Sequence, residues 1–235
     1  MRPVDKGESP TEGEFRHYRQ AFPELVKRLG AYCSYCERKV STSLAVEHVC
    51  PKSKHKNLKN KWSNFLLACT QCNSSKNATD ISPDDLEEYV WPDRDDTYHM
   101  ITYLPENGYE ARVNENISPI DKERVRKTLD LVNINANTTE YGDTNYLNKL
   151  GERRDAAKAC QEQLISLKRL SNLLEKYPDD VACKEEYENR KKEIIESAKI
   201  YGFWSIWMNY FEDIPEIKAR LLDFYNTKKQ YFPVN

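Results

Sequence analysis

The first third of the chain alternates short apolar runs with polar segments, a pattern that predicts one helix and two strands. Apolar positions one helical turn apart indicate a helix over residues 14–30, and Gly30 is a suitable end for it. Residues 44–50 and 64–69 are short runs rich in apolar side chains, which is typical of buried strands. The basic segment between these strands predicts a loop, and residues 70–77 predict a helix or a tight turn.

The middle of the chain predicts a small hairpin, and the remainder predicts helices. Residues 80–115 mix turn residues with two candidate strands, 97–104 and 109–114, and the dipeptide Asn107-Gly108 between them is typical of a hairpin. The rest of the chain predicts helices over four stretches, the middle two as an antiparallel pair: from Ser118, over 144–176, over 180–211, and from Pro215.

Together these elements predict a mostly helical α+β fold with three parts. The parts are an N-terminal segment of two strands and helices (1–80), an acidic connecting region with the candidate hairpin (81–117) and a helical bundle (118–235). The last 35 residues hold ten of the 26 aromatic residues, far more than their share. This enrichment favours a helical core filled by large rings, or else a docking face for a protein partner.

Four of the seven cysteines form two Cys-x-x-Cys pairs, which is the spacing of a metal-binding knuckle. The pairs are Cys33 with Cys36 and Cys69 with Cys72. Four thiolates satisfy tetrahedral Zn²⁺ and leave no open coordination position, so we expect a structural zinc site. The alternative, four buried thiols without metal, does not explain the repeated spacing. Zinc would close the segment between the pairs, which is too short to build a large core unaided.

Composition and charge narrow the classes of function. The chain opens with a polar segment, and no stretch approaches the roughly 20 apolar residues of a membrane span, so we expect a cytoplasmic protein. Residues 33–77 carry eight Lys or Arg and two acidic residues, whereas residues 78–123 carry three and thirteen. The basic segment favours nucleic-acid binding, with a solvated loop as the plain alternative.

An acidic residue and a histidine, Glu47 and His48, stand side by side inside the first predicted strand. Burying either side chain without a partner costs free energy, so the pair calls for an explanation. The surrounding segment, YCSYC…VEHVCPKS…WSNFLLACTQCNSSK, resembles the HNH endonuclease family with its ββα-metal core. The resemblance covers residues 31–77 and consists of the acidic–His pair, a middle Asn and a final Cys-x-x-Cys-Asn-x-x-Lys.

This resemblance implies roles for individual residues. It places the general base on His48, the ligands of a catalytic metal on Glu47 and Asn73, a structural Asn on Asn64 and a basic position on Lys76. The family more often has Asp and His where this chain has Glu47 and Asn73. Asn in place of His favours an ion that prefers oxygen ligands, such as Mg²⁺ or Mn²⁺.

Elementary chemistry is consistent with these roles. Neighbouring residues on a strand point to opposite sides, so Glu47 and His48 can place a metal and a base on opposite sides of a phosphodiester. An imidazole with an ordinary pKa near 6.5 suits a general base at neutral pH. We expect nucleic-acid contacts from five basic residues of this segment, namely Lys52, Lys54, His55, Lys56 and Lys76.

Three other interpretations stay open at this point. In the first, His48 is a core residue whose polar atoms are satisfied, and Glu47 only pairs with a lysine. The segment would then be a zinc ribbon that binds nucleic acid or protein without cutting. His55 is a weaker candidate for the base, in the lysine-rich loop. Finally, the chain is an assembly subunit with a degenerate nuclease site, although the intact motif positions argue against this.

Segments outside the core narrow the resemblance. MRPV, VWPDRDDT (90–97) and RKTLDLVNIN (126–135) are similar to HNH proteins of the PtuB type, which are partners of an ATPase in Septu-type anti-phage systems, some of them linked to retrons. This implies a complex with an SMC/ABC-like ATPase of the PtuA type and DNA as substrate, or else RNA, including tRNA. The aromatic C-terminal helices are then the candidate docking surface, and the acidic residues 80–96 would repel nucleic acid from the free protein.

Overall fold

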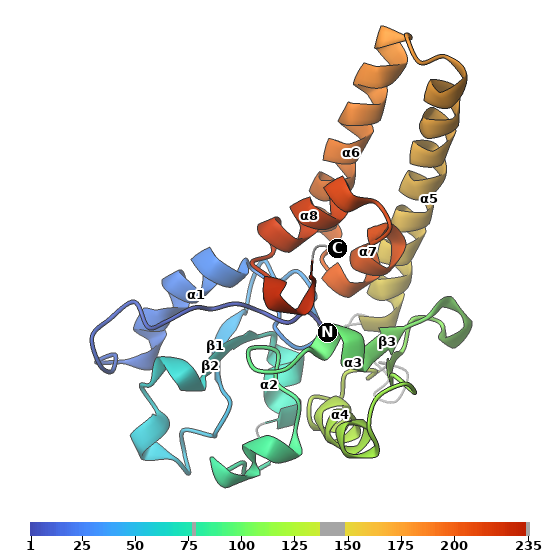
Figure 1. Ribbon diagram of the computed structural model, residues 1–235. Coiled ribbons are helices and arrows are strands. Elements are labelled where there is room, and N and C mark those ends of the chain that lie inside the picture. The colour runs from blue at the N-terminus through green and yellow to red at the C-terminus, as the bar shows by residue number, and fades with distance from the viewer. Residues whose placement is uncertain (77–78, 137–148, 234–235) are drawn as a thin grey trace.

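The computed structural model describes residues 1–76, 79–136 and 149–233 of the chain. Its elements confirm a mostly helical α+β fold with two small antiparallel sheets. Figure 1 shows a broad body that contains both sheets and a long helical hairpin that rises from it.

The first sheet lies between two helices. Strand β1 (Ala45–His48) pairs antiparallel with β2 (Phe65–Ala68). All four residues of β2 are buried, since α1 (Phe22–Leu29) packs against this strand and α2 (Thr70–Lys76) follows it directly. The strand–strand–helix order predicted from the sequence is therefore present.

The first helix is shorter than the sequence predicted. A 3-10 turn (η1, Tyr18–Ala21) precedes α1, and the residues before it are not helical. Pro23 stands in the first turn of α1, a position where its missing N–H costs little. Gly30 ends the helix as predicted, with a φ of 74° that other residues rarely adopt.

The second sheet is the predicted hairpin. Strand β3 (Ile101–Tyr103) pairs with β4 (Ala111–Val113), and Gly108 between them has a left-handed conformation with φ 59°. The first candidate strand is shorter than expected because a turn of helix, α3 (Thr97–Met100), comes before β3. The side chain of Asp96 caps this helix, which explains why the chain coils there.

Helix α4 (Pro119–Leu131) begins as the sequence predicted. Ser118 Oγ accepts a hydrogen bond of 3.1 Å from the backbone N–H of Asp121, and a proline occupies the first helical position. Val125 and Leu129 are buried on one face of the helix, which packs against β4.

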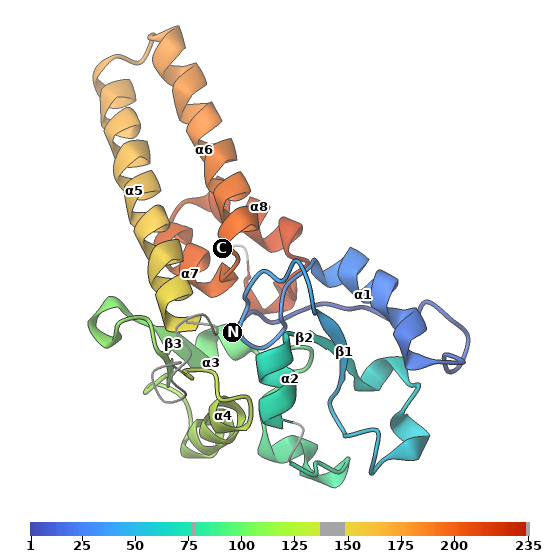
Figure 2. The same cartoon turned by 180° about the vertical axis from the view of Figure 1, so that it is seen from behind.

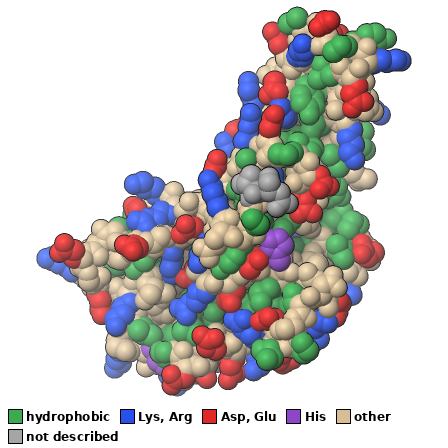
Figure 3. Space-filling view, viewed as in Figure 1, with side chains coloured by type: hydrophobic (Ala, Val, Ile, Leu, Met, Phe, Trp, Pro, Cys, Tyr) green, Lys and Arg blue, Asp and Glu red, His purple; other side chains and the backbone are tan. Residues whose placement is uncertain are grey.

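A long hairpin of two helices, which we call the arm, consists of α5 (Lys149–Lys176) and α6 (Val181–Tyr201). Figures 1 and 2 show the arm extending away from the body, from which its outer half is separated. Residues 144–148, which the sequence assigned to the first of these helices, lie outside the described residues. Hydrophobic side chains lie among charged ones on the arm (Figure 3), and the exposed ones include Ile165, Leu173, Tyr177 and Val181.

The predicted continuous helix over 180–211 is wrong. The chain breaks at Gly202 and Phe203, whose φ values are 74° and 53°, and a separate helix, α7 (Trp204–Phe211), follows. Gly202 forms an isolated bridge with Arg38, and a Cβ at this glycine would lie 2.8 Å from a backbone oxygen of the loop around the first cysteine pair. The helix therefore ends where its backbone must lie against that loop.

One hydrophobic core runs through all three parts predicted from the sequence. Helix α8 (Pro215–Phe224) begins at the predicted proline and packs against α6 and α7. Six aromatic residues of the C-terminal segment are buried in this core: Phe203, Trp204, Trp207, Phe211, Tyr225 and Phe232. No helix in the described part of the chain is both long and apolar enough to cross a bilayer.

Candidate metal and catalytic centre

The four paired cysteines lie together where the loop after α1 meets the start of α2. Their Sγ atoms are all within 4.8 Å of one another, and those of Cys36 and Cys69 are 3.8 Å apart. Tetrahedral Zn–S bonds of about 2.3 Å separate sulfur atoms by about 3.8 Å, so the cluster fits Zn²⁺. All four cysteines are buried and none forms a disulfide. Four close thiols of this kind are the donor set of the structural zinc site that the sequence predicted.

A buried lysine connects this cluster to the arm. Lys149, the first residue of α5, is fully buried and lies with its Nζ 3.4 Å from Cys72 Sγ, to which it donates a hydrogen bond. The same ammonium donates to the backbone oxygen of Asn133 at 3.1 Å. A zinc ion bound by four thiolates is anionic, so the ammonium would neutralise part of that charge. The base of the arm is thereby fixed to α2.

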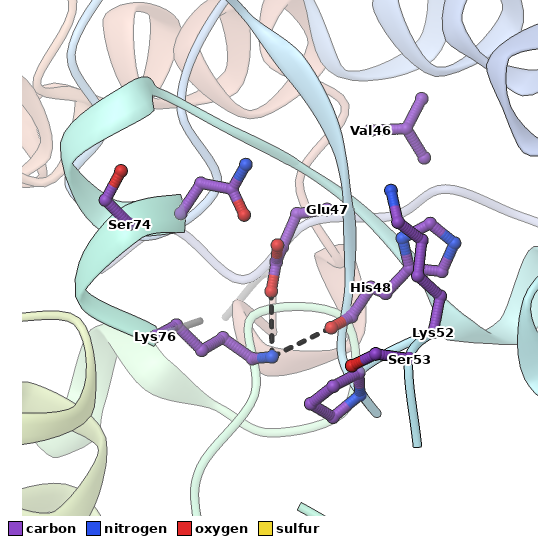
Figure 4. A pocket seen from close by; sticks show the side chains of 9 residues that line it. Val46, Glu47, His48, Lys52, Ser53, Ser74 and Lys76 are labelled. Atoms are coloured by element: carbon purple, nitrogen blue, oxygen red, sulfur yellow. Dashed lines mark hydrogen bonds and ion pairs between the residues drawn. The ribbon is translucent and has the colours of Figure 1, made fainter. Parts of the chain in front are cut away.

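Glu47 and His48 end strand β1 and extend to opposite sides of it. Figure 4 shows the Glu47 carboxylate directed toward α2 and the His48 ring on the side of Lys52. Both residues nevertheless line one cavity of about 270 Å³, to which α2 contributes Asn73, Ser74 and Lys76. We call this space the catalytic cavity. The divergence expected from strand alternation is therefore present, and it brings the two side chains to a common space.

A buried ion pair holds the Glu47 carboxylate. The side chains of Glu47 and Lys76 are both almost fully buried, with Lys76 Nζ 2.9 Å from Glu47 Oε1 and 2.8 Å from the His48 backbone oxygen (Figure 4). Burial raises the pKa of the Glu47 carboxyl, and the neighbouring ammonium opposes that rise. The Oε1 atom is buried and faces the Lys76 ammonium, which therefore neutralises the carboxylate charge on this side.

The His48 ring is held in the form that a general base requires. Its Nε2 lies 2.8 Å from the backbone oxygen of Lys59. Because a carbonyl oxygen only accepts, we assign the ring proton to Nε2, which leaves the lone pair on Nδ1. The ring packs edge-on against Phe65 and Tyr18, with centroid separations of 5.3 and 4.9 Å. Burial lowers the pKa of His48 to about 4, which corrects the ordinary value near 6.5 expected from the sequence: the imidazole is neutral at pH 7, but it is a weaker base than a free histidine.

Asn64 acts on this site through the backbone. Its Oδ1 accepts a hydrogen bond of 2.7 Å from the backbone N–H of Cys50, and its Nδ2 donates to the backbone oxygens of Cys50 and Leu58 at 3.0 and 3.2 Å. The side chain is almost fully buried and does not line the catalytic cavity. It joins the two ends of the basic loop, and that loop supplies the Lys59 oxygen that orients His48.

The basic residues expected to contact nucleic acid occupy different environments. Lys52, Lys54 and Lys56 are exposed, and Lys52 also lines the catalytic cavity. His55 lies 3.4 Å from Asp80 and does not line the cavity, so the structure does not place it as a base there. Lys76, the fifth of these residues, is almost fully buried beside Glu47 and also contributes to the lining of the cavity.

Glu47 and Asn73 offer the donor chemistry of a hard divalent ion. One carboxylate and one amide oxygen line the same cavity from β1 and α2. Mg²⁺ is commonly held by one or two carboxylates while water and phosphate oxygens complete its octahedron. The residues therefore fit Mg²⁺ or Mn²⁺, and the cavity has room for the remaining oxygen ligands.

Three features of the site have no signal in the sequence. Tyr18 contacts His48 from thirty residues away in the chain, and Lys59 contributes only its backbone oxygen. Lys149 opens a helix in the C-terminal part, where its burial against Cys72 cannot be read from any local pattern.

Comparison with known proteins bears on the same segment. Residues 33–79 match the model of the HNH endonuclease family. No curated protein and no solved structure matched the chain. The matched segment contains both cysteine pairs and the residues of the catalytic cavity that β1 and α2 contribute. The family match and the cysteine cluster together support a metal-binding nuclease domain of the HNH type.

Proposed function

We propose that this protein is a metal-dependent HNH endonuclease that hydrolyses phosphodiester bonds of nucleic acid, with DNA as its substrate. The observation that carries the proposal is the pairing of a neutral imidazole, His48, with a buried carboxylate, Glu47, on two sides of one strand that both reach the catalytic cavity. A base and an oxygen ligand facing one space are what in-line hydrolysis of a phosphodiester requires.

The residues of the cavity have separate roles in this proposed reaction. His48 Nδ1 accepts the proton of the attacking water, while the hydrogen bond from Nε2–H to the Lys59 oxygen keeps the ring in place and stabilises the imidazolium that forms. Glu47 and Asn73 would hold Mg²⁺ or Mn²⁺, which supplies Lewis-acid stabilisation of the phosphate and the leaving oxygen. Lys52, at the cavity wall, reduces the repulsion between the substrate phosphate and the carboxylate.

The basic loop supports a polyanionic substrate without selecting its sequence. Lys52, Lys54 and Lys56 are exposed on one loop beside the cavity, a placement that suits contacts to the phosphate backbone. Neither arm helix lines the cavity, and contacts to the phosphate backbone carry no sequence information of their own. DNA is the proposed substrate, and RNA or tRNA is the alternative.

We further propose that the protein is the effector subunit of an anti-phage complex with an SMC/ABC-like ATPase. The support is the similarity of segments 90–97 and 126–135 to PtuB-type proteins, together with an arm that carries exposed apolar residues such as Leu173 and Tyr177. Co-purification from the native operon tests this: an ATPase is expected with the protein, and its absence would remove the proposal for a partner without affecting the nuclease.

The nuclease proposal is tested by cleavage assays on purified variants. His48→Ala should lower the cleavage rate by at least about 100-fold, since a positioned base contributes that much, while zinc content and nucleic-acid binding are retained. His99→Ala is the matched control, because that histidine is half-exposed, pairs with Asp96 and does not line the catalytic cavity. Undiminished cleavage by His48→Ala would reject the base, and binding without any cleavage by the wild type would favour a non-catalytic zinc-binding module.

A further inference from the structure

A second cavity adjoins the catalytic cavity on the N-terminal side of β1. It has a volume of about 430 Å³ and shares three wall residues with the catalytic cavity: Val46, Lys52 and Asn73. Its remaining walls come from η1, α1 and the start of β1. We call it the flanking cavity. Because the two cavities share these residues, a chain molecule bound in one is positioned to continue into the other.

The lining of the flanking cavity combines apolar surface with positive charge. Phe22 and Leu44 are partly buried apolar side chains, and the Tyr18 ring forms a further wall. Two cationic side chains, Arg19 and Lys52, stand at the same cavity. Of the described residues that line it, none is acidic. A flat apolar group attached to an anion is the ligand that matches such a lining, and a nucleotide has both parts.

Tyr18 connects the flanking cavity directly to His48, the proposed general base. Its ring centroid is 4.9 Å from that of His48, and its hydroxyl accepts a hydrogen bond of 3.1 Å from Lys52 Nζ. The Lys52 ammonium also lies 4.2 Å from the centroid of the Tyr18 ring. Tyr18 alone therefore separates a group bound in this cavity from the His48 ring, whose Nδ1 would take the proton in hydrolysis.

We propose that the flanking cavity binds the nucleoside next to the scissile phosphate and thereby selects an unpaired strand. This inference rests on the proposed nuclease function. A nucleobase that enters the cavity contacts Phe22 and Leu44 and must leave the base stack of a duplex. Unstacking costs the least free energy when the strand is already single. Arg19 and Lys52 bind the phosphate that follows. The contributing helix lies before residue 33, outside the segment that matches the HNH family.

Equilibrium binding tests the proposal without relying on cleavage. All proteins in this test carry Glu47→Gln, which removes a ligand of the proposed metal. Glu47 does not line the flanking cavity, so the substitution leaves that cavity unchanged. Binding is measured by fluorescence anisotropy with a labelled oligothymidylate and with a blunt duplex of the same length. Phe22→Ala and Arg19→Gln should each weaken binding of the single strand by about 10-fold and change binding of the duplex by less than about twofold. Losses that are equal for both ligands, or absent for both, would overturn the proposal.

Two control variants separate this effect from charge and stability. Arg16→Gln removes an exposed arginine that lines neither cavity, and Phe224→Ala removes an exposed aromatic ring on α8. Both should bind the two ligands as the parent does. If the wild type never cleaves nucleic acid but the strand-selective loss is observed, the nuclease proposal fails while the nucleoside site stands. If the wild type cleaves but no variant shows the strand-selective loss, the nucleoside site fails while the nuclease stands.

Discussion

At the scale of single residues, Lys76 links the two halves of the proposed catalytic site. Its ammonium lies against the Glu47 carboxylate and donates to the His48 backbone oxygen, and the whole side chain is almost fully buried. The motif predicted a basic residue at this position, but only the structure shows that it faces inward. A residue of this kind fixes the geometry of both Glu47 and His48.

Removing the Lys76 charge should therefore destabilise the fold strongly. Lys76→Met leaves the Glu47 carboxylate buried without a partner, a change that costs about 3–5 kcal/mol in comparable buried pairs. Urea unfolding at pH 7 measures the loss. Lys56→Met, at an exposed lysine of the neighbouring loop, should cost less than about 0.5 kcal/mol. The double variant Glu47→Gln/Lys76→Met should recover much of the stability. A loss below about 1 kcal/mol for Lys76→Met would contradict the buried pair.

The lowered pKa of His48 predicts a signed dependence of stability on pH. The folded protein binds the His48 proton near pH 4, whereas the unfolded chain binds it near pH 6.5. Between these values the unfolded state holds more protons, so stability falls as the pH is lowered from about 6.5 toward 4. His48→Gln has no imidazole to titrate. The free energy of unfolding of the wild type should therefore fall by up to about 3 kcal/mol more than that of the variant over that range. Parallel losses in both proteins would show that His48 is not buried in its neutral form.

Sequence reasoning named three residues that line one cavity in the structure, but not what orients them. Glu47, His48 and Asn73 follow from a motif whose members stand at fixed spacing, and strand alternation predicted that the first two diverge. The contacts of the Lys59 oxygen and the Tyr18 ring with His48 could not be predicted from the sequence. One is a backbone atom with no residue signature, and the other comes from a distant segment that only tertiary packing brings to His48.

At the scale of elements, the four cysteines close the strand–strand–helix unit. The two sheet strands have only four residues each, and so short a hairpin is at best marginally stable alone. Zinc at the cysteine cluster would clamp the loop before β1 to the start of α2. The spacing of the two Cys-x-x-Cys pairs was sufficient to predict this cluster, because four ligands must converge for tetrahedral binding.

Loss of one thiolate should therefore unfold this unit and release the metal. Cys69→Ser should abolish stoichiometric zinc, measured by elemental analysis, and make residues 33–76 accessible to limited proteolysis. Cys160→Ser is the matched control, since Cys160 is equally buried but lies on α5 outside the cluster. Its zinc content should be unchanged. Full zinc content in Cys69→Ser, with normal protease resistance, would mean that the cluster is not a zinc site.

The break between α6 and α7 is one feature that sequence reasoning missed. Helical periodicity continues through Gly202, and the reason for the break lies in another part of the chain, the loop at Arg38. A glycine inside an apparent helix was the available signal, and its weight depends on packing that the pattern does not contain. The helix starts at Ser118 and Pro215, by contrast, depend on local features and were predicted correctly.

This break makes Gly202 sensitive to the smallest substitution. Gly202→Ala requires a positive φ and a Cβ 2.8 Å from two backbone atoms, so it should cost more than about 1 kcal/mol and lower the melting temperature by several degrees. Gly13→Ala controls for the backbone term, because Gly13 has φ 82° and no atom within 4 Å of its Cβ position. Equal effects of the two substitutions in thermal unfolding would argue against close contact at Gly202.

Across the molecule, the parts predicted from the sequence share one core and one buried linkage. The hydrophobic core extends from the first residues to the C-terminal helices, and Lys149 joins the base of the arm to Cys72 on α2. Helix α2 also carries Asn73 and Lys76, so the arm is connected through one helix to the catalytic cavity. Composition and charge indicated the separate segments, but the connection depends on long-range packing and could not be predicted from them.

The proposed chemistry depends on β1 and α2 building a site for a divalent ion beside a general base. Anomalous scattering from a crystal soaked in Mn²⁺ locates such an ion without an activity assay, and a Glu47→Gln crystal is the matched control. We expect an anomalous peak in the catalytic cavity within bonding distance of Glu47 and Asn73, across the cavity from His48, and no peak in the control. An empty cavity in the wild-type crystal, or a peak that Glu47→Gln leaves unchanged, would contradict the proposed site.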